Sequence, residues 1–363
     1  MSRALRTGHP DPLAGRVVSG FVARPILADV IPFVLPPAMH TGGGDQEALP
    51  RFTLGTVFTQ WELVSWATVT ILLTTALYLW GVWRLQSRGD RWPVGRTAAF
   101  LGAMVAAAMA TVAGFGAYDD TLLSAHMAQH MILSMLVPLM MALGAPITLA
   151  LRTLPRRPRG WLLVALHSRV ARVLSFPPLT FVLFVITPWA LYFSGWYPAS
   201  LHHDYLHEMT HLHMVVVGCL FFWPMVGIDP LPGRITYPAR MLLVVLTLPF
   251  HAFMGVTIMA QDKLIGGDWY PELHEGPMGA WLPNAHADQH LAGGILWSSG
   301  DAIGLLFFAV LFAQWARASM AEAKREDRRL DLLEAREARA AAAASEAARE
   351  AVVGTPVRED DGR

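Results

Sequence analysis

Long apolar segments alternate with short polar connectors along most of this chain. Seven of these segments are long enough to cross the hydrocarbon core of a membrane, which takes about 20 helical residues. Proline lies inside several of them, and neighbouring helices of a bundle accommodate the kinks that proline causes. The pattern predicts an all-α, polytopic membrane protein with seven transmembrane helices, at about residues 61–83, 97–117, 122–151, 173–194, 206–228, 239–260 and 289–316.

Basic residues mark one side of the predicted bundle. Arginine and lysine gather after the first, third, fifth and seventh segments, whereas the connectors 118–121, 195–205 and 261–288 contain Lys263 and no arginine. Connectors rich in basic residues stay on the cytoplasmic side of a membrane. We therefore expect a multi-pass protein of a bacterial plasma membrane, with its N-terminus outside and its C-terminus in the cytoplasm.

The pattern divides the chain into three regions. Residues 1–54 form an extracytoplasmic segment with little expected structure, because prolines and charged residues interrupt its apolar stretch. Residues 55–318 hold the seven-helix domain. Residues 319–363 are rich in Ala, Glu and Arg, and predict a cytoplasmic tail that is helical or disordered and whose helix frays at Gly354 and Pro356.

Composition narrows the chemistry that the chain can carry. The sequence is 54% hydrophobic and 15% charged with zero net charge, so nothing points to a nucleic-acid partner. Cys219 is the single cysteine, which excludes an intrachain disulfide and a CxxC motif. A metal site in this protein must therefore use histidine, methionine or carboxylate ligands.

Histidines lie in four of the predicted spans, and in two of these they recur at helical spacing. Residues four apart lie one above the other on a helix, and His126 with His130, and His207 with His211, have this spacing. His251 lies in the sixth span and His290 near the start of the seventh, with Asp301 at mid-depth. Ionisable groups inside a bilayer usually face the bundle interior and are often functional.

The predicted topology places most of these imidazoles near the outer face of the membrane. Imidazole suits copper, zinc and iron, and the thioether of methionine favours Cu(I). Methionines lie beside the histidines at helical spacing, as Met127, Met131 and Met214. We interpret the set as a site for copper, with the ligands His126, His130, His207, His211, His290, His251, Met127, Met131, Met214 and Asp301. Asp301 is expected either to pair with a histidine or to take part in ion movement.

Other functions fit parts of this pattern. Residues 207–211 match HExxH, the motif of zinc metalloproteases, but such an enzyme needs a third ligand and has no use for the other histidine pairs. Histidines on facing helices could instead bind b-type haem in an electron carrier. A copper transporter and a His-ligated di-metal oxidase or hydroxylase stay open as well.

Three runs resemble the CtaG-type cytochrome c oxidase assembly factors that are associated with caa-type oxidases. These are HMAQHM at 126–131 with Gly144-Ala145-Pro146 after it, HxxxHLHM with GCLFFWP in the fifth span, and DQHLAGGILW at 288–297. The resemblance covers about residues 55–318, and its matching positions are His126, His130, His207, His211 and His290. The inclusion of His251 and Asp301 among the ligands depends only on their depth and helix face, and not on the resemblance.

The resemblance implies a role in building haem–copper oxidase, with copper supplied to it at the extracytoplasmic face. The expected partners are oxidase subunits and soluble extracytoplasmic copper carriers, within the lipid bilayer. No enzymatic activity is expected. Transfer would proceed through His and Met ligands, since the chain lacks the cysteine pair that many copper chaperones use.

Overall fold

The structure, a computed structural model, describes residues 49–353 apart from residues 54, 62, 64 and 234. All regular secondary structure in these residues is helical. Six stretches of it are long and apolar enough to cross a membrane, or seven if one bent pair of helices counts as a single span. The predicted all-α membrane fold is confirmed. The side of the membrane on which each terminus lies stays a prediction.

The spans follow the apolar segments closely. In chain order they are α2 (Trp66–Gln86), α3 (Val94–Thr111) with α4 (Gly114–Ala117), the series α5 (Leu123–Met131), η3 (Ile132–Leu136), α6 (Val137–Gly144) and α7 (Pro146–Thr153), then α10 (Pro177–Tyr192) with α11 (Trp196–His202), α12 (Asp204–Val226), α13 (Tyr237–Met259) and α15 (Ala285–Val353). Short helices occupy connectors: α1 (Thr56–Thr59), α8 (Arg156–Leu166), α9 (Arg169–Leu174) and α14 (Trp269–Glu275).

The third and fifth spans form the centre of the bundle. In each of them 56% of the most apolar 18-residue stretch is buried inside the protein, whereas in α2 this share is 17%. Eight of the nine residues of α5 are buried, polar ones included. Because protein rather than lipid surrounds this part of the chain, polar side chains on α5 and α12 can find polar partners.

A proline shapes the contact between these two central spans. Pro138 has no N–H to offer the carbonyl of Ser134, four residues earlier, and the helix widens here into the π-helical segment η3. Gly218 of α12 faces the same carbonyl, and a Cβ on Gly218 would overlap it. The glycine thus allows α12 to pack closely against the third span.

The fourth span breaks after α10. Pro188 lies inside α10, and the chain bends by 61° between α10 and α11. The predicted segment 173–194 therefore corresponds to the 16-residue helix α10 followed by a turn. The bend places Tyr192 and Tyr197, on either side of the break, in contact with each other.

Small residues join the sixth and seventh spans. A Cβ on either Gly255 of α13 or Gly293 of α15 would press against the backbone oxygen of the other residue. Farther along, Gly300 leaves room for the ring of His251. Small residues at such positions let membrane helices approach closely.

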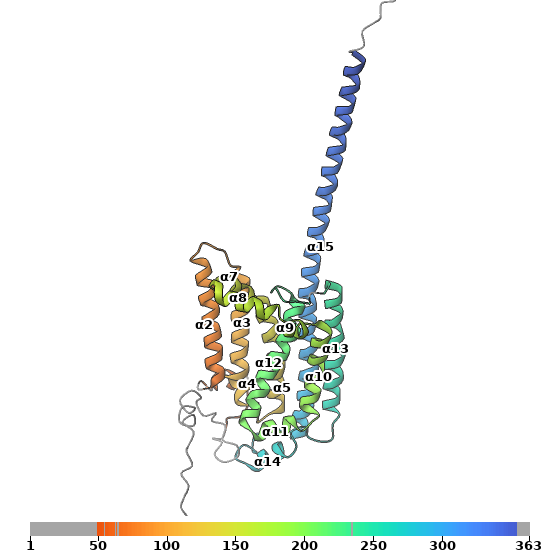
Figure 1. The fold of residues 1–363 in the computed structure, drawn as a ribbon. Coiled ribbons are helices and arrows are strands. Elements are labelled where there is room, and N and C mark those ends of the chain that lie inside the picture. The colour runs from red at the N-terminus through yellow and green to blue at the C-terminus, as the bar shows by residue number, and fades with distance from the viewer. Residues whose placement is uncertain (1–48, 54, 62, 64, 234, 354–363) are drawn as a thin grey trace, which may run out of the picture. The chain divides into compact units, whose positions relative to one another are not determined.

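Helix α15 continues far beyond the bundle, with 69 residues in all. Figure 1 shows it leaving the bundle at the end where α8 and α9 lie, whereas α11 and α14 lie at the opposite end. Its described side chains from Arg317 to Ser345 are almost all exposed, in keeping with a solvated helical tail. Gly354, Pro356 and nearly all of the N-terminal region 1–54 lie outside the described residues.

Candidate metal centre

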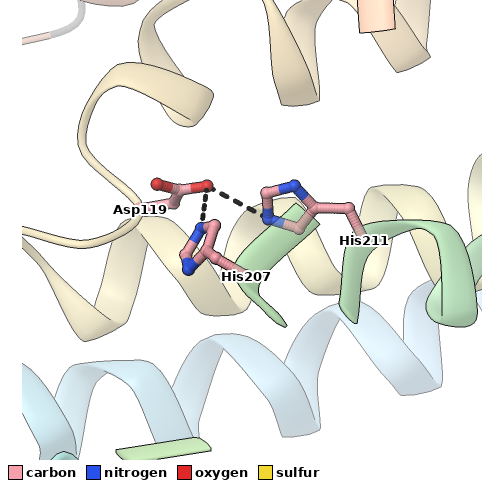
Figure 2. Close-up of side chains that lie close together, drawn as sticks. All are labelled: Asp119, His207 and His211. Carbon is pink, nitrogen blue, oxygen red and sulfur yellow. Dashed lines mark hydrogen bonds and ion pairs between the residues drawn. The ribbon is translucent and has the colours of Figure 1, made fainter. Parts of the chain in front are cut away.

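A carboxylate and two imidazoles meet at the end of the bundle near α11. Asp119 lies in the connector between α4 and α5, and His207 and His211 occupy successive turns of α12. One oxygen, Oδ2 of Asp119, lies 3.1 Å from His207 Nε2 and 3.2 Å from His211 Nε2. Figure 2 shows the carboxylate pointing between the two rings. In the described part of the chain, this is the group of His, Cys, Asp or Glu residues whose ligand atoms all lie within 4.8 Å of one another.

Further side chains hold this arrangement in place. The amide of Gln129, one turn into the third span, donates to Asp119 Oδ2 over 2.5 Å and to the carbonyl of Ala110 over 2.9 Å. Glu208 Oε2 lies 3.5 Å from His211 Nδ1, the ring nitrogen that faces away from Asp119. The indole of Trp269 donates to the backbone oxygen of Asp120 and so fixes the connector itself.

Electrostatics keep Asp119 charged although its side chain is buried. The residue is only 3% exposed, and burial by itself raises the pKa of a carboxyl group. The charge and hydrogen bonding of His207 and His211 outweigh burial and hold the pKa of Asp119 well below its usual range. The site therefore presents an anionic oxygen at neutral pH.

The spacing of the ligand atoms suits a metal ion. Tetrahedral coordination with metal–ligand distances of about 2.0–2.2 Å sets ligand atoms about 3.3–3.6 Å apart. The two contacts of Asp119 Oδ2, at 3.1 and 3.2 Å, are close to this spacing. Small side-chain shifts would bring all three groups onto one ion. A narrow cavity of about 20 Å³, lined by Asp119, Asp120, Ser200, Leu201, Asp204 and His207, adjoins them and has room for about one water-sized particle.

A third imidazole lies beside the cluster. His126 is fully buried, and its ring centroid lies 6.2 Å from that of His207. Neither of its ring nitrogens has a hydrogen-bond partner among the described residues. His126 thus lies beside the cluster, on the first turns of α5, although its nitrogens are not among the ligand atoms that all lie within 4.8 Å of one another.

Two other predicted ligands lie deeper and have protein partners of their own. His130 Nδ1 is 2.9 Å from the hydroxyl of Tyr192, and His251 Nδ1 is 2.9 Å from the carbonyl oxygen of Thr247. Neither residue belongs to the group around Asp119. The partner that the structure gives Asp301 is the indole of Trp297, at 2.9 Å, rather than a hydrogen-bonded histidine.

His290 lies away from the cluster on the exposed face of α15. Its neighbours take the interior instead: Asp288 accepts from the backbone N–H of Ser124, and Gln289 binds the backbone N–H of Ile265. Since residues two apart point to nearly opposite sides of a helix, burial of Asp288 turns His290 outward. His290 was expected at a depth similar to that of the other histidines, but its side chain does not join them.

The predicted methionine ligands pack in the apolar core. Met127, Met131 and Met214 are all buried and belong to one hydrophobic cluster. Buried methionine is a common core residue, and the packing of these three side chains is what the hydrophobic cluster explains.

The ligand set expected from the sequence did not include Asp119 or Gln129. Asp119 was visible as one of two acidic residues in the short connector just before His126, but connectors carry no periodicity that assigns a side chain to the interior. Gln129 lies between Met127 and His130 and reads as an ordinary polar residue of a helix.

Comparison with known proteins identifies one family over most of the chain. The profile of the family described as cytochrome c oxidase caa3 assembly factor (Caa3_CtaG) matches residues 76–318, a stretch that contains Asp119 and the histidines discussed above. No solved structure matches the chain.

Similar proteins occur in mycobacteria. The chain is 39% identical over 286 residues to the uncharacterized protein Mb0105 of Mycobacterium bovis, covering 77% of this chain and 43% of that protein. The same values hold for the uncharacterized protein MT0111 of Mycobacterium tuberculosis. With the uncharacterized protein ML1998 of Mycobacterium leprae it is 37% identical over 281 residues, covering 76% of this chain and 42% of the relative. The chain thus spans less than half the length of these relatives, and its matched region makes it a member of the cytochrome c oxidase caa3 assembly factor family.

Proposed function

We propose that this assembly factor handles copper for a haem–copper oxidase. Copper is here the cargo, held at the cluster of Asp119, His207 and His211 and passed to an oxidase subunit or accepted from a soluble carrier. The observation that supports copper handling most directly is the meeting of two imidazoles on one buried carboxylate oxygen, at 3.1 and 3.2 Å. Imidazole ligands suit copper.

The proposal places the cluster at the extracytoplasmic face of the cell membrane. The arginines of α8 and α9 lie at the end of the bundle where α15 leaves it, and the cluster lies near α11 at the other end (Figure 1). By the positive-inside tendency, the end with α8 and α9 faces the cytoplasm. Copper would then be exchanged on the side where extracytoplasmic carriers move.

Copper binding by the purified protein tests this function directly. Competition with a Cu(I) chelator should give one tightly bound ion per chain, and the double variant His207→Gln/His211→Gln should lose it. His167→Gln is the matched control, because His167 lies in the connector after α8 at the other end of the bundle. If the double variant bound Cu(I) as tightly as the parent, the cluster would not be the copper site.

A cellular measurement connects the site with oxidase assembly. A deletion strain should lose cytochrome c oxidase activity in copper-poor medium and regain it with the parent gene, but not with the double variant. Normal oxidase activity of the deletion strain in that medium would contradict the assembly role. Restoration by added copper would favour supply of the metal over a structural role.

The HExxH alternative has one specific observation in its favour, because Asp119 provides the third ligand that a zinc site on His207 and His211 would need. Glu208, however, lies against His211 Nδ1, as a carboxylate does when it orients a metal-bound histidine. Glu208→Gln separates the two functions. A protease would lose its general base and all activity, whereas a copper site should keep its ion with an affinity weakened about 10- to 100-fold.

A further inference from the structure

The buried ring of His126 is the least satisfied polar group near the cluster. It is fully buried, and both Nδ1 and Nε2 lack hydrogen-bond partners among the described residues. Burial of a polar group without a partner is costly, and each such group in a folded protein calls for an explanation, such as an ion that completes its environment.

The aromatic neighbours of His126 do not supply that partner. The rings of Tyr197 and Tyr192 lie 4.7 and 5.9 Å from it, centroid to centroid. Their hydroxyls are engaged elsewhere, since Tyr197 pairs with the hydroxyl of Tyr270 at 2.6 Å and Tyr192 with His130 Nδ1 at 2.9 Å. His126 is therefore enclosed by rings whose polar atoms point to other residues.

The ring of His126 also lies beside His207, one of the three residues of the cluster. Two imidazoles on one ion, each with its nitrogen about 2.0–2.1 Å from the metal, have ring centroids about 5 Å apart in tetrahedral geometry and about 6 Å apart when they lie opposite each other. The centroids of His126 and His207 are 6.2 Å apart, and those of His207 and His211 are 4.6 Å apart. His126 lies outside the group whose ligand atoms are all within 4.8 Å of one another, so an ion at the cluster would bind all three rings once the ring of His126 moves toward it.

We propose that His126 is the fourth ligand of the metal centre and gives it a closed set of three imidazoles and one carboxylate. This rests on the copper site proposed above and assigns to it, of the further histidines expected from the sequence, the one ligand from a second transmembrane span that the buried ring of His126 supports. One ion bound to Asp119, His126, His207 and His211 would then link the α4–α5 connector, α5 and α12. Such a set uses only nitrogen and oxygen, so Met127, Met131 and Met214 keep their place in the apolar core.

X-ray absorption spectroscopy of the copper-loaded protein, combined with chelator competition, tests this ligand count. The spectrum of the parent should fit three imidazoles per ion, and that of His126→Gln should fit two. The dissociation constant of His126→Gln should rise at least tenfold. The control is His130→Gln, one turn farther along the same helix, where the ring already has Tyr192 as its partner; it should keep three imidazoles and the parent affinity.

The possible results distinguish a failure of His126 as a ligand from a failure of the copper site as a whole. A parent spectrum with only two imidazoles would overturn the role of His126 even if no variant could be purified. The same holds if His126→Gln bound copper within threefold of the parent affinity. A parent protein that binds no copper in the competition assay would instead remove the proposed copper site itself.

Discussion

Replacement of Asp119 by asparagine tests how far the carboxylate governs the site. The substitution keeps the size of the side chain and removes its charge. Two donors converge on Asp119 Oδ2, the amide of Gln129 at 2.5 Å and Nε2 of His207 at 3.1 Å, and Nε2 of His211 lies 3.2 Å from the same oxygen as an ion pair. An asparagine oxygen can still accept from Gln129, but it offers a metal ion no negative charge.

The expected loss of affinity follows from the strength of contacts to charged groups. An interaction of this kind contributes about 1.5–3 kcal/mol. The high end of this range applies because the group is buried and keeps its charge at neutral pH. A loss of about 2–3 kcal/mol corresponds to a dissociation constant for copper that is about 30- to 140-fold higher.

The assay is competition with a Cu(I) chelator at pH 7, on detergent-purified protein whose helix content is checked by circular dichroism. Asp268→Asn is the control, because Asp268 is exposed just before α14, in the connector that reaches over Asp120. An Asp119→Asn protein that stays folded and binds copper within threefold of the parent would refute the assignment of Asp119 as a ligand.

Two further predictions concern stability and are read from thermal unfolding in detergent. Gly218→Ala should destabilise the bundle by about 2 kcal/mol, as overpacking does, because its methyl group would meet the Ser134 carbonyl; Gly294→Ala, where a Cβ meets nothing within 4 Å, should stay near the parent. Asp229→Ala should cost about 3 kcal/mol, since its carboxylate accepts from the backbone N–H groups of Ile147 and Thr148 at the start of α7 and from the indole of Trp223. An unchanged midpoint in either variant would contradict the packing or the capping role.

The transmembrane spans could be predicted because each depends on a single local property. About 20 apolar residues in a row specify a membrane helix whatever its neighbours are, and six of the seven predicted segments correspond to helices long enough to span. The exception, at 173–194, depends on the break after α10, where the bend between two helices is a tertiary feature. The pairing of His207 with His211 was likewise predictable, since it needs only the helical repeat.

The rest of the site depends on how helices rotate against each other. The start of α15 carries Asp288, Gln289 and His290 in succession, so polarity alone does not tell which residue faces inward. The interior contacts of Asp288 with Ser124 and of Gln289 with Ile265 decide the rotation. Both contacts join segments far apart in the sequence, and a single sequence contains no record of them.

The protonation state of His211 leads to a last prediction, because both of its ring nitrogens face carboxylates. Nε2 lies 3.2 Å from Asp119 and Nδ1 lies 3.5 Å from Glu208. An ionised carboxylate only accepts hydrogen bonds, so the ring satisfies both neighbours only when each nitrogen carries a proton. A copper ion bound at Nε2 must replace the proton there, since a metal ligand has to be deprotonated.

Copper binding should therefore release at least one proton per ion, and acid should reverse it. The pKa of Asp119 is held well below its usual range, so between pH 7 and pH 5 its carboxylate stays charged and the competition with protons falls on the histidines. The apparent copper affinity should drop steadily over this interval, by about tenfold per pH unit for each proton that is exchanged. Calorimetric titration in buffers of different ionisation enthalpy counts the released protons directly. Binding that released no proton and kept its affinity at pH 5 would mean that copper is held by groups other than these imidazoles.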